Sequence, residues 1–401
     1  MSNDTQPEIR FPGFTEDWEQ RKLGEVVKIN GRIGFRGYTQ ADIIRKEDGG
    51  ILAFSPTNII NNKLDFNVKN TYITKDKYYE SPEIMVKNGD ILFVKTGSTL
   101  GKSASVSNLN EEATINPQIV ILRATSYFIS EFISSYLISN NILKQVAQTR
   151  IGGAVPTLTE TEIKRFQISA PKGKEQQKIG TLFKQLDDTI ALHQRKLDLL
   201  KETKKGFLQK MFPKNGAKVP EIRFPGFTED WEERRLQEVV DRYDNLRIPI
   251  TASKRVAGNT PYYGANGIQG YVEGYTHDGE FILVAEDGAN DLKNYPVQYV
   301  DGKVWVNNHA HVIQAKENLA DNMFLMNAIR SINIEPFLVG GGRAKLNADV
   351  LMKLEVIIPL KSEQQKIGNF FKQLDDTITL HQRKLDLLKE TKKGFLQKMF
   401  V

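Results

Sequence analysis

The chain has 401 residues, with 55 Lys and Arg against 49 Asp and Glu, 40% apolar residues and no cysteine. This length allows two or three domains with well-filled cores, and the composition argues against wholesale disorder. The absence of cysteine excludes disulfides, thiolate zinc sites, iron–sulfur clusters and cysteine nucleophiles. Because no apolar run could span a membrane and the first ten residues lack the apolar stretch of a secretory signal, we expect a cytoplasmic protein without membrane contact.

Two segments occur twice in the chain. The short segment 7–19, PEIRFPGFTEDWE, recurs unchanged at 220–232. The long segment 175–212 recurs at 363–400, and 35 of the 38 positions agree. Because the stretches between these repeats share only traces of sequence, we interpret the chain as two copies of one scaffold that carry two different inserts.

The first insert, residues 20–174, contains short β-type runs that are bounded by turn residues. Strands are predicted at Gly50–Phe54, Glu83–Val86, Asp90–Val94 and Ile119–Leu122. A helix is predicted at roughly Ser130–Gln148, ahead of the long repeat.

The long repeat is predicted to be a single helix, because it contains no proline and its apolar residues recur in a mostly heptad rhythm. In front of its second copy, Ser362 and Gln365 form a capping-box signature. One face forms an apolar seam of Ile179, Leu186, Ile190, His193, Leu197 and Leu200, with Ile367, Leu374, Ile378, His381, Leu385 and Leu388 in the second copy. A helix with one apolar stripe requires a partner, and the other copy supplies it.

The second insert, residues 233–362, repeats the style of the first. Strands are predicted at Gln269–Val272, Glu280–Val284, Val297–Val300, Val304–Val306, His311–Gln314 and Leu354–Pro359. A helix is predicted near Asp321–Ser331. Each insert is therefore expected to be α+β, with a mostly antiparallel, turn-rich sheet and one or two helices.

We expect the two long helices to form an antiparallel coiled coil within the chain, with a pseudo-twofold axis at their midpoint and one insert at each end. Leu186 then opposes Leu388, and His193 lies beside His381. These histidines are either polar residues tolerated in the seam or parts of a catalytic or metal site, and no carboxylate or third ligand is placed to complete such a site.

The expected domains are a first domain at 1–174, a helix at 175–212, a linker and second domain at 213–362, and a helix at 363–401. Each long repeat holds eight Lys or Arg against five Asp or Glu, so the two repeats carry the whole net charge of +6. The inserts are neutral as a whole. They can bind nucleic acid through a local basic face, but not through bulk charge.

Several short motifs resemble catalytic or ligand sites but lack essential members. Gly97 to Ser103 has three residues between its glycines instead of the four of a phosphate loop, and a β-turn with an exposed lysine is the alternative. The run 116–118 resembles the Asn-Pro-Pro-aromatic loop of amino-methyltransferases, without the second proline and the aromatic residue. His309 and His311 lack a third metal ligand, and Glu-x-Lys triplets are short enough to occur by chance. We therefore predict no catalytic residue and no metal site in this chain.

What remains is the chemistry of base and phosphate recognition. Segment 261–271 interleaves Tyr, Asn and Gln with glycines, and glycine-rich basic loops precede the long helices at 150–153 and 340–347. Asn and Gln read adenine edges, Arg reads guanine and Lys holds phosphates, whereas ordinary hairpin turns are the alternative for each segment. The candidate DNA-binding residues are Lys95, Ser98, Lys102, Asn116 and Arg150 in the first insert, and Tyr263, Asn266, Gln269, Asn308, His309, Arg343 and Lys345 in the second.

The whole chain resembles a specificity subunit of type I restriction–modification systems. The doubled EIRFPGF opening, the doubled helix from QQKIG to KKGFLQKMF, and the run from YYGANGIQGY to ILVAEDG carry this resemblance. It implies two target-recognition domains that read the halves of a bipartite, asymmetric DNA target, held apart by an antiparallel coiled coil. It also implies a non-catalytic chain that docks two adenine-methyltransferase subunits and, through them, motor-nuclease subunits. The complex is then expected to use S-adenosylmethionine, ATP and Mg²⁺, none of them bound by this chain.

Three other functions remain open from the sequence. A stand-alone DNA-binding regulator would bind DNA usefully without partner subunits. A nuclease with an unrecognised site would cleave DNA as the purified chain with metal. A scaffold joined by its coiled coil would give no protection of DNA at all.

Overall fold

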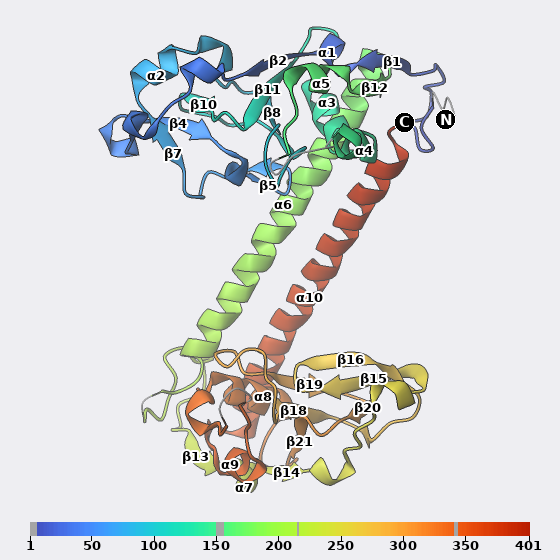
Figure 1. Ribbon diagram of the computed structural model, residues 1–401. Helices are drawn as coiled ribbons and strands as arrows, with labels where there is room; N and C mark the ends of the chain where they lie inside the picture. Colours follow the sequence, from blue (N-terminus) through green and yellow to red (C-terminus); the bar gives the residue numbers. More distant parts are fainter. Residues whose placement is uncertain (1–5, 150–155, 215, 341–343) are drawn as a thin grey trace. The chain divides into compact units, whose positions relative to one another are not determined.

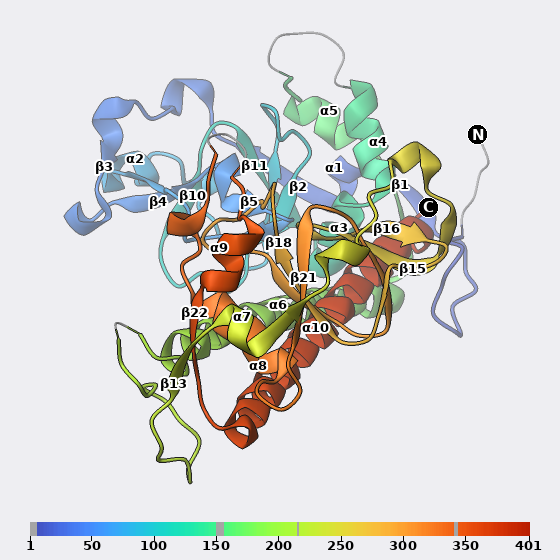
Figure 2. The same cartoon turned by 90° about the horizontal axis from the view of Figure 1, so that it is seen from below.

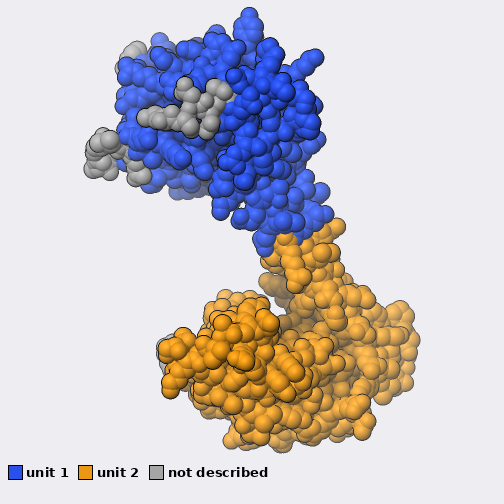
Figure 3. All heavy atoms as spheres, turned by 90° about the vertical axis from the view of Figure 1, so that its right-hand side faces the viewer, with its two compact units in different colours: residues 1–193, 384–401 blue, residues 194–383 orange. Residues whose placement is uncertain are grey.

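The computed structural model describes residues 6–149, 156–214, 216–340 and 344–401 of the chain. It divides into two compact units, coloured separately in Figure 3. Unit 1 comprises residues 1–193 and 384–401, and unit 2 comprises residues 194–383. Each unit therefore contains one insert, the beginning of one long helix and the end of the other.

Unit 1 is built around a four-stranded antiparallel sheet in the order β2-β11-β8-β9. Its strands are β2 (Val27–Gly31), β8 (Ile91–Val94), β9 (Ser103–Ser105) and β11 (Ile119–Ala124). A second sheet has the order β10-β4-β7-β3, from β3 (Ile43–Ile44), β4 (Ile51–Phe54), β7 (Thr71–Ile73) and β10 (Ala113–Ile115). Smaller pairs join β1 (Glu19–Lys22) to β12 (Gln167–Ala170) and β5 (Ile59–Ile60) to β6 (Lys63–Leu64). The helices of the insert are α1 (Leu23–Val26), α2 (Lys75–Tyr79), α3 (Ser130–Leu137), α4 (Asn140–Thr149) and α5 (Glu160–Arg165).

Unit 2 repeats the central sheet with the corresponding order β14-β21-β18-β19 (Figure 1). Its strands are β14 (Val240–Arg242), β18 (Phe281–Ala285), β19 (Val297–Val300) and β21 (Ala310–Ala315). The second sheet, β16-β15-β20-β17, contains β15 (Ala257–Gly264), β16 (Gly267–Val272), β17 (His277–Asp278) and β20 (Lys303–Val306). A further pair joins β13 (Glu232–Arg235) to β22 (Glu355–Ile358). The helices are α7 (Leu236–Val239), α8 (Asn322–Ser331) and α9 (Ala348–Lys353), and α7 lies beside α9 (Figure 2).

The central strands are apolar on both faces because each sheet is covered on both sides. In unit 1, Val120 and Leu122 of β11 face a core that includes α3 and the start of the long helix. Ile119 and Ile121 point the other way, into a core shared with the second sheet. Unit 2 has the same division into two cores. Each insert is thus α+β, as the sequence predicts.

The two long helices are α6 (Gly173–Lys210) and α10 (Lys361–Lys398), drawn in green and red in Figure 1. In unit 1, Lys392 Nζ of α10 lies 2.7 Å from Asp187 Oδ1 of α6. In unit 2, Lys204 Nζ of α6 lies 2.5 Å from Asp375 Oδ1 of α10. Both contacts require the helices to run in opposite directions, which confirms the predicted antiparallel coiled coil within one chain.

The register of this pair differs from the prediction. The predicted pairing of Leu186 with Leu388 would set Asp187 against Leu387, whereas Asp187 faces Lys392, five residues further along α10. The reason is that the lysine–aspartate pairs and the aromatic residues at the helix ends select the register, and a heptad pattern by itself permits several.

The end of each long helix completes the core of the unit that contains it. In unit 1 the Phe400 ring lies 5.5 Å from Phe183 and 6.5 Å from Trp18, measured between ring centroids. In unit 2 the Phe212 ring lies 6.0 Å from Phe371 and 6.3 Å from Trp231. These are the same repeated residues in both units, so the repeated sequence encodes one core junction twice.

Each insert is attached to its long helix at a repeated glycine. A Cβ on Gly180 would lie 2.9 Å from Phe132 N, and one on Gly368 would lie 3.1 Å from Phe324 N. Such distances leave room only for glycine, because the first turn of α3 or α8 presses against the helix backbone. The buried Gln364 side chain, by accepting from Asp321 N at 3.1 Å, fixes the same junction in unit 2.

Most predicted strands are confirmed, with three local corrections. Glu83–Val86 is not a strand, because Pro82 opens a 3-10 turn over Pro82–Ile84. The helix predicted at Ser130–Gln148 is two helices, α3 and α4, separated at Ile138 and Ser139. The sheets are mostly antiparallel as predicted, but β10 runs parallel to β4 and β15 parallel to β20.

Candidate nucleic-acid interface

In unit 2, several candidate residues meet beside the end of β18. Asn307 N donates to Tyr263 O at 3.1 Å, which joins the turn after β20 to the end of β15. Asn266 Nδ2 donates to Gly288 O at 2.8 Å, and Asn290 N donates to Asn266 Oδ1 at 2.9 Å. Both ends of the Asn266 amide therefore hold the loop 288–290, and its role is to shape this edge rather than to present a free amide.

The described residues on either side of 341–343 reach the same edge. Val339 and Lys345 exchange two backbone hydrogen bonds of 2.9 Å. Lys345 also forms a bridge with Asp287, and its Nζ lies 3.0 Å from Glu286 Oε1. Leu346 N donates to Glu286 O at 2.7 Å, so the loop is fastened to the residues that follow β18.

The described candidates of the second insert therefore lie on or beside one set of loops. Asn308 and Gln269 are exposed, and Gln269 lies over Gly264, where a Cβ would be 2.2 Å from its Nε2. Tyr263 is half-buried, and burial followed by the nearby Tyr271 raises its pKa. His309 is half-buried and its Nδ1 is paired with Asp287. Arg343 lies outside the described residues.

A buried ionic network of Asp244, Arg247, Glu286 and His311 lies behind this edge, and the sequence analysis singles out only His311 among these four. Asp244 accepts hydrogen bonds from Val312 N at 2.7 Å and from His311 Nδ1 at 2.8 Å. Burial acts to raise the pKa of Asp244, but these hydrogen bonds and the charges of His311 and Arg247 outweigh it and lower the pKa. The available signal was the pair Glu286-Asp287 directly after five buried apolar residues, where an unpaired carboxylate would be costly.

In unit 1, the corresponding edge carries Lys95, which follows β8. Leu158 N donates to Lys95 O and Lys95 N donates to Gln118 O, both at 2.8 Å. Gly97 N donates to Pro156 O at 3.0 Å, so the segment before α5 is fastened beside the loop that joins β8 to β9. The two edges therefore share their backbone design, with Lys95 in the place of Glu286.

The remaining candidates of the first insert divide between this loop and its surroundings. Ser98 and Lys102 are exposed on the loop from β8 to β9. Asn116 is buried and accepts from Gln118 N at 3.0 Å, so it shapes the neighbouring turn. Arg150 lies outside the described residues. Ser98 and Lys102 are thus the described candidates with exposed side chains at this edge, and Lys95 is half-buried.

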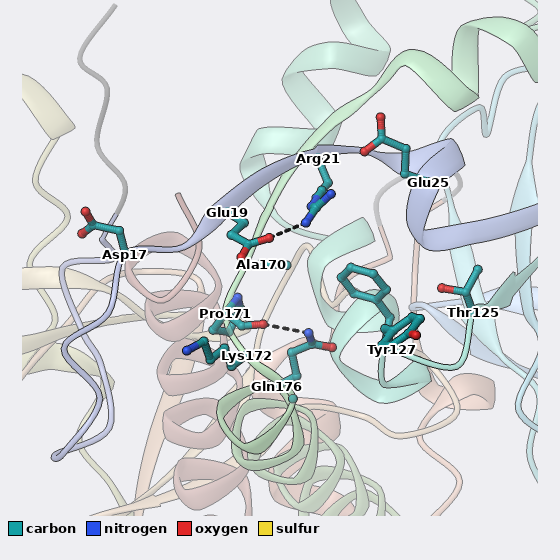
Figure 4. A pocket seen from close by; sticks show the side chains of 12 residues that line it. Asp17, Glu19, Arg21, Glu25, Thr125, Tyr127, Ala170, Pro171, Lys172 and Gln176 are labelled. Carbon is teal, nitrogen blue, oxygen red and sulfur yellow. Dashed lines mark hydrogen bonds and ion pairs between the residues drawn. The ribbon is translucent and has the colours of Figure 1, made fainter.

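A cavity of about 510 Å³ opens in unit 1 at the start of α6. Figure 4 shows Glu19 paired with Arg21 and Gln176 bonded to the carbonyl of Pro171 inside it. Its lining also includes Asp17 and Glu25. These acids make it a poor site for a nucleic-acid backbone. Within the described segments, no three His, Asp or Glu side chains gather closely enough to hold a metal ion.

The seam candidates lie on the inner faces of α6 and α10. Ile179, Leu197, Ile367 and Leu385 are buried, and Leu186, Ile190, Leu200, Leu374, Ile378 and Leu388 are half-buried. His193 and His381 belong to different units and are also half-buried. Leucines one position before the histidines, Leu192 and Leu380, are 58% and 64% exposed on the outer face. In the described part of the chain, no helix has the length and apolar character that crossing a bilayer requires.

Comparison with known proteins places this architecture. The family model of the type I restriction modification DNA specificity domain matches residues 15–202 and 228–390. A putative type I restriction enzyme specificity subunit of Haemophilus influenzae is 47% identical over 154 residues, which span 38% of this chain and 39% of that protein. The putative MjaX specificity subunit of Methanocaldococcus jannaschii is 22% identical and aligns over 95% of this chain and 92% of its own length.

A solved structure shows the same fold. The crystal structure of the S subunit of a type I restriction–modification system from M. genitalium matches with a TM-score of 0.70, at 14% identity and over 99% of both chains. Because the family model covers both units and most of the sequence, this chain belongs to the type I restriction–modification DNA specificity family, as a non-catalytic specificity subunit.

Proposed function

We propose that this specificity subunit reads a bipartite, asymmetric DNA target, with one half-sequence read by each unit. The observation that carries the proposal is that the two central sheets have the same strand order but different side chains at the corresponding edge. Both units have a central sheet of the same strand order, yet its edge carries Lys95 in unit 1 and Glu286 in unit 2. Two domains with the same fold and different side chains at the corresponding edge are suited to recognising two different base sequences.

The contacts with DNA are proposed at these edges. Lys95, Ser98 and Lys102 supply cations and a hydroxyl in unit 1. Asn308 and Lys345 are exposed or half-exposed in unit 2. Amide and hydroxyl groups read base edges in the major groove, whereas lysines neutralise phosphates. Because the long repeats carry the whole net charge, each edge by itself provides few cations, and affinity for DNA is expected to depend on partner subunits.

The outer face of the long helices is the proposed docking surface for two methyltransferase subunits. Leu192 and Leu387 are 58% and 66% exposed in unit 1, and the register of Asp187 with Lys392 sets them level with each other. Leu199 and Leu380 form the equivalent pair in unit 2, at 67% and 64% exposure. Apolar side chains kept on an outer face, identical in both copies, indicate a binding surface. Two copies of the surface fit two copies of one partner.

The partners supply the chemistry in this proposal. The methyltransferase subunits bind S-adenosylmethionine and modify adenine, and motor-nuclease subunits join through them with ATP and Mg²⁺. The specificity subunit contributes only the choice and spacing of the two half-sequences.

Exchanging one insert tests the bipartite reading. Residues 20–174 are replaced by the corresponding insert of another specificity subunit, and the complex is expressed with its methyltransferase in a host without other adenine methylation. Sequencing of methylated adenines should show a new first half-sequence, an unchanged second half-sequence and an unchanged spacer. A target that is new in both halves, or the absence of any methylated sequence with the natural chain, contradicts the proposal.

A further inference from the structure

Unit 2 contains a buried histidine that bridges its central sheet to the glycine-rich loop. His311, on β21, is 1% exposed. Its Nδ1 lies 2.8 Å from Asp244 Oδ2, and its Nε2 lies 2.9 Å from Leu346 O. Lys345 and Leu346 form the base of the glycine-rich loop. The histidine therefore connects the interior of the sheet directly to this loop base.

Both ring nitrogens of His311 face oxygen atoms. A carbonyl oxygen only accepts, so Nε2 donates to Leu346 O. Nδ1 faces Asp244, whose pKa is held below the usual range by its hydrogen bonds and the nearby charges although burial opposes this. Glu286 Oε2 lies 3.5 Å from the same Nδ1, so the ring joins two carboxylates of the sheet edge to Leu346.

The carboxylate of Glu286 ties the rest of the loop base to the same network. Its Oε2 lies 2.7 Å from Arg247 Nη1 and its Oε1 lies 3.0 Å from Lys345 Nζ. Its backbone oxygen accepts from Leu346 N at 2.7 Å. Lys345 and Leu346 are thus held through a backbone N–H, a backbone carbonyl and a side chain at once, which leaves the loop base one arrangement.

Unit 1 has no such link at the equivalent positions. Leu158 N donates to Lys95 O, as Leu346 N donates to Glu286 O in unit 2. In this alignment of the two central sheets, Val120 of β11 occupies the position of His311 on β21. Opposite Val120 is Gly31, at the position that Asp244 reaches when the register of β14 is continued. In unit 1, backbone hydrogen bonds join Pro156 to Gly97 and Leu158 to Lys95.

We propose that His311, held by Asp244, is a positioning residue for the second half-sequence alone: it fixes the loop base 345–346 so that the edge of unit 2 distinguishes bases. This inference rests on the proposed bipartite reading. His311 itself is buried and touches no DNA. Its loss relaxes discrimination in the half-sequence read by unit 2 and leaves the other half-sequence unaffected.

The test uses the complete complex of this chain with its methyltransferase subunits. The double variant His311→Val with Asp244→Asn removes the link without leaving a buried charge unpaired, and His311→Gln keeps one donor for Leu346 O. Val120→Ala serves as the matched control, because it disturbs the same strand position of unit 1 through packing only. Initial methylation rates are measured on duplexes with single base changes in each half, after the insert exchange has assigned the halves to the units.

We expect the double variant to lose roughly tenfold in discrimination within the second half, the equivalent of one charge-assisted hydrogen bond. His311→Gln should lose less, and Val120→Ala should leave the ratio unchanged in both halves. Amide exchange at Leu346 should accelerate by a similar factor in the double variant, while exchange at Leu158 stays as in the natural chain.

Three results overturn the inference. Unchanged discrimination in a folded double variant shows that the link does not position the edge. Equal losses in both halves show general loosening, and failure of both His311 variants to fold shows a purely structural role. If the natural complex itself selects no bipartite target, the proposed function fails first, and this outcome is visible before any variant is made.

Discussion

The corresponding edge of the central sheet carries different side chains in the two units. In unit 1, a Cβ on Gly31 would lie 2.5 Å from Glu160 Oε1 and 3.3 Å from Lys95 Nζ, so the ends of two long side chains occupy the space beside this glycine. In unit 2, the equivalent position holds Asp244, which is paired with the buried His311. The difference shows that the fold constrains the backbone register, whereas the chemistry behind the edge is free to change with the insert.

The repeated segments, in contrast, form the same contacts in both units. Arg10 with Glu175 and Arg223 with Glu363 form the same buried ion pair in the two units, at 2.7 Å and 2.8 Å. Ile9 N donates to Lys398 O, and Ile222 N donates to Lys210 O, at 3.0 Å and 2.9 Å. The scaffold is therefore duplicated down to single contacts, and the predictions below ask how far this equivalence extends into stability.

The largest effect is expected at the aromatic junctions. Phe400→Ala in unit 1 and Phe212→Ala in unit 2 should each cost about 3–5 kcal/mol of unfolding free energy, because a nearly buried ring leaves a cavity. Hydrogen exchange followed by mass spectrometry should locate each loss in the unit that contains the ring. Leu192→Ala, at an exposed site, is the control and should change stability by less than about 0.5 kcal/mol. Equal losses in both units from a single substitution would refute the assignment of one junction to each unit.

The second prediction separates the units by pH. Because the folded-state pKa of Asp244 lies below the ordinary value of 3.8, its ionised form contributes stability at neutral pH that is lost as the pH falls through the folded pKa. Unit 2 should therefore weaken below about pH 4 more steeply than the Asp244→Asn variant, by on the order of 1–3 kcal/mol. The measurement is hydrogen exchange of unit 2 peptides at pH 3 to 7. Parallel pH profiles for the natural chain and the variant would contradict this prediction.

The two interhelical lysines, Lys204 and Lys392, should differ in their contribution to stability although they occupy the same position of the long repeat. Burial lowers the pKa of Lys204, and the positive charge of Arg330 adds to this, while Asp375 opposes it. Arg330 Nη1 lies 3.6 Å from Asp375, so this carboxylate keeps a cation when Lys204 is removed. Asp187 also keeps one, because Lys63 Nζ lies 3.8 Å from it, but Lys63 is the more exposed cation, at 41% against 24% for Arg330, and water screens it more. Lys392→Met should therefore cost about 1 kcal/mol and Lys204→Met close to zero in urea unfolding. The opposite order would mean that Arg330 does not compensate.

The smallest effect on stability is expected at the outer leucines. Leu192→Asp together with Leu387→Asp should change the unfolding free energy by less than about 0.5 kcal/mol, because both side chains are exposed. The same pair should reduce the methyltransferase content of the purified complex from two subunits to one, measured by native mass spectrometry. Leu199→Asp with Leu380→Asp is the matched pair in unit 2. Retention of two subunits by both variants would exclude this face as the docking surface.

Residue types indicate which segments carry polar and basic side chains, but not how those side chains are used. Lys95, Asn308 and Lys345 were identified because glycine-rich turns with amides and lysines are typical of nucleic-acid contacts. Asn266 and Asn116 were identified for the same reason, yet their amides are used within the protein. A side chain that reads a base and one that shapes a turn have the same local signature, and only their neighbours distinguish them.

The amino-acid sequence by itself determined the duplication, the two long helices and the α+β character of the inserts, because periodicity and repeats are local properties of the chain. Only the tertiary structure decided that Asp187 meets Lys392, that Pro82 turns the chain where a strand was expected, and that His311 joins Asp244 to Leu346. The contacts of Asp187 and His311 join residues between 35 and 205 positions apart. Their formation depends on packing around each pair, and no window of the sequence contains that information.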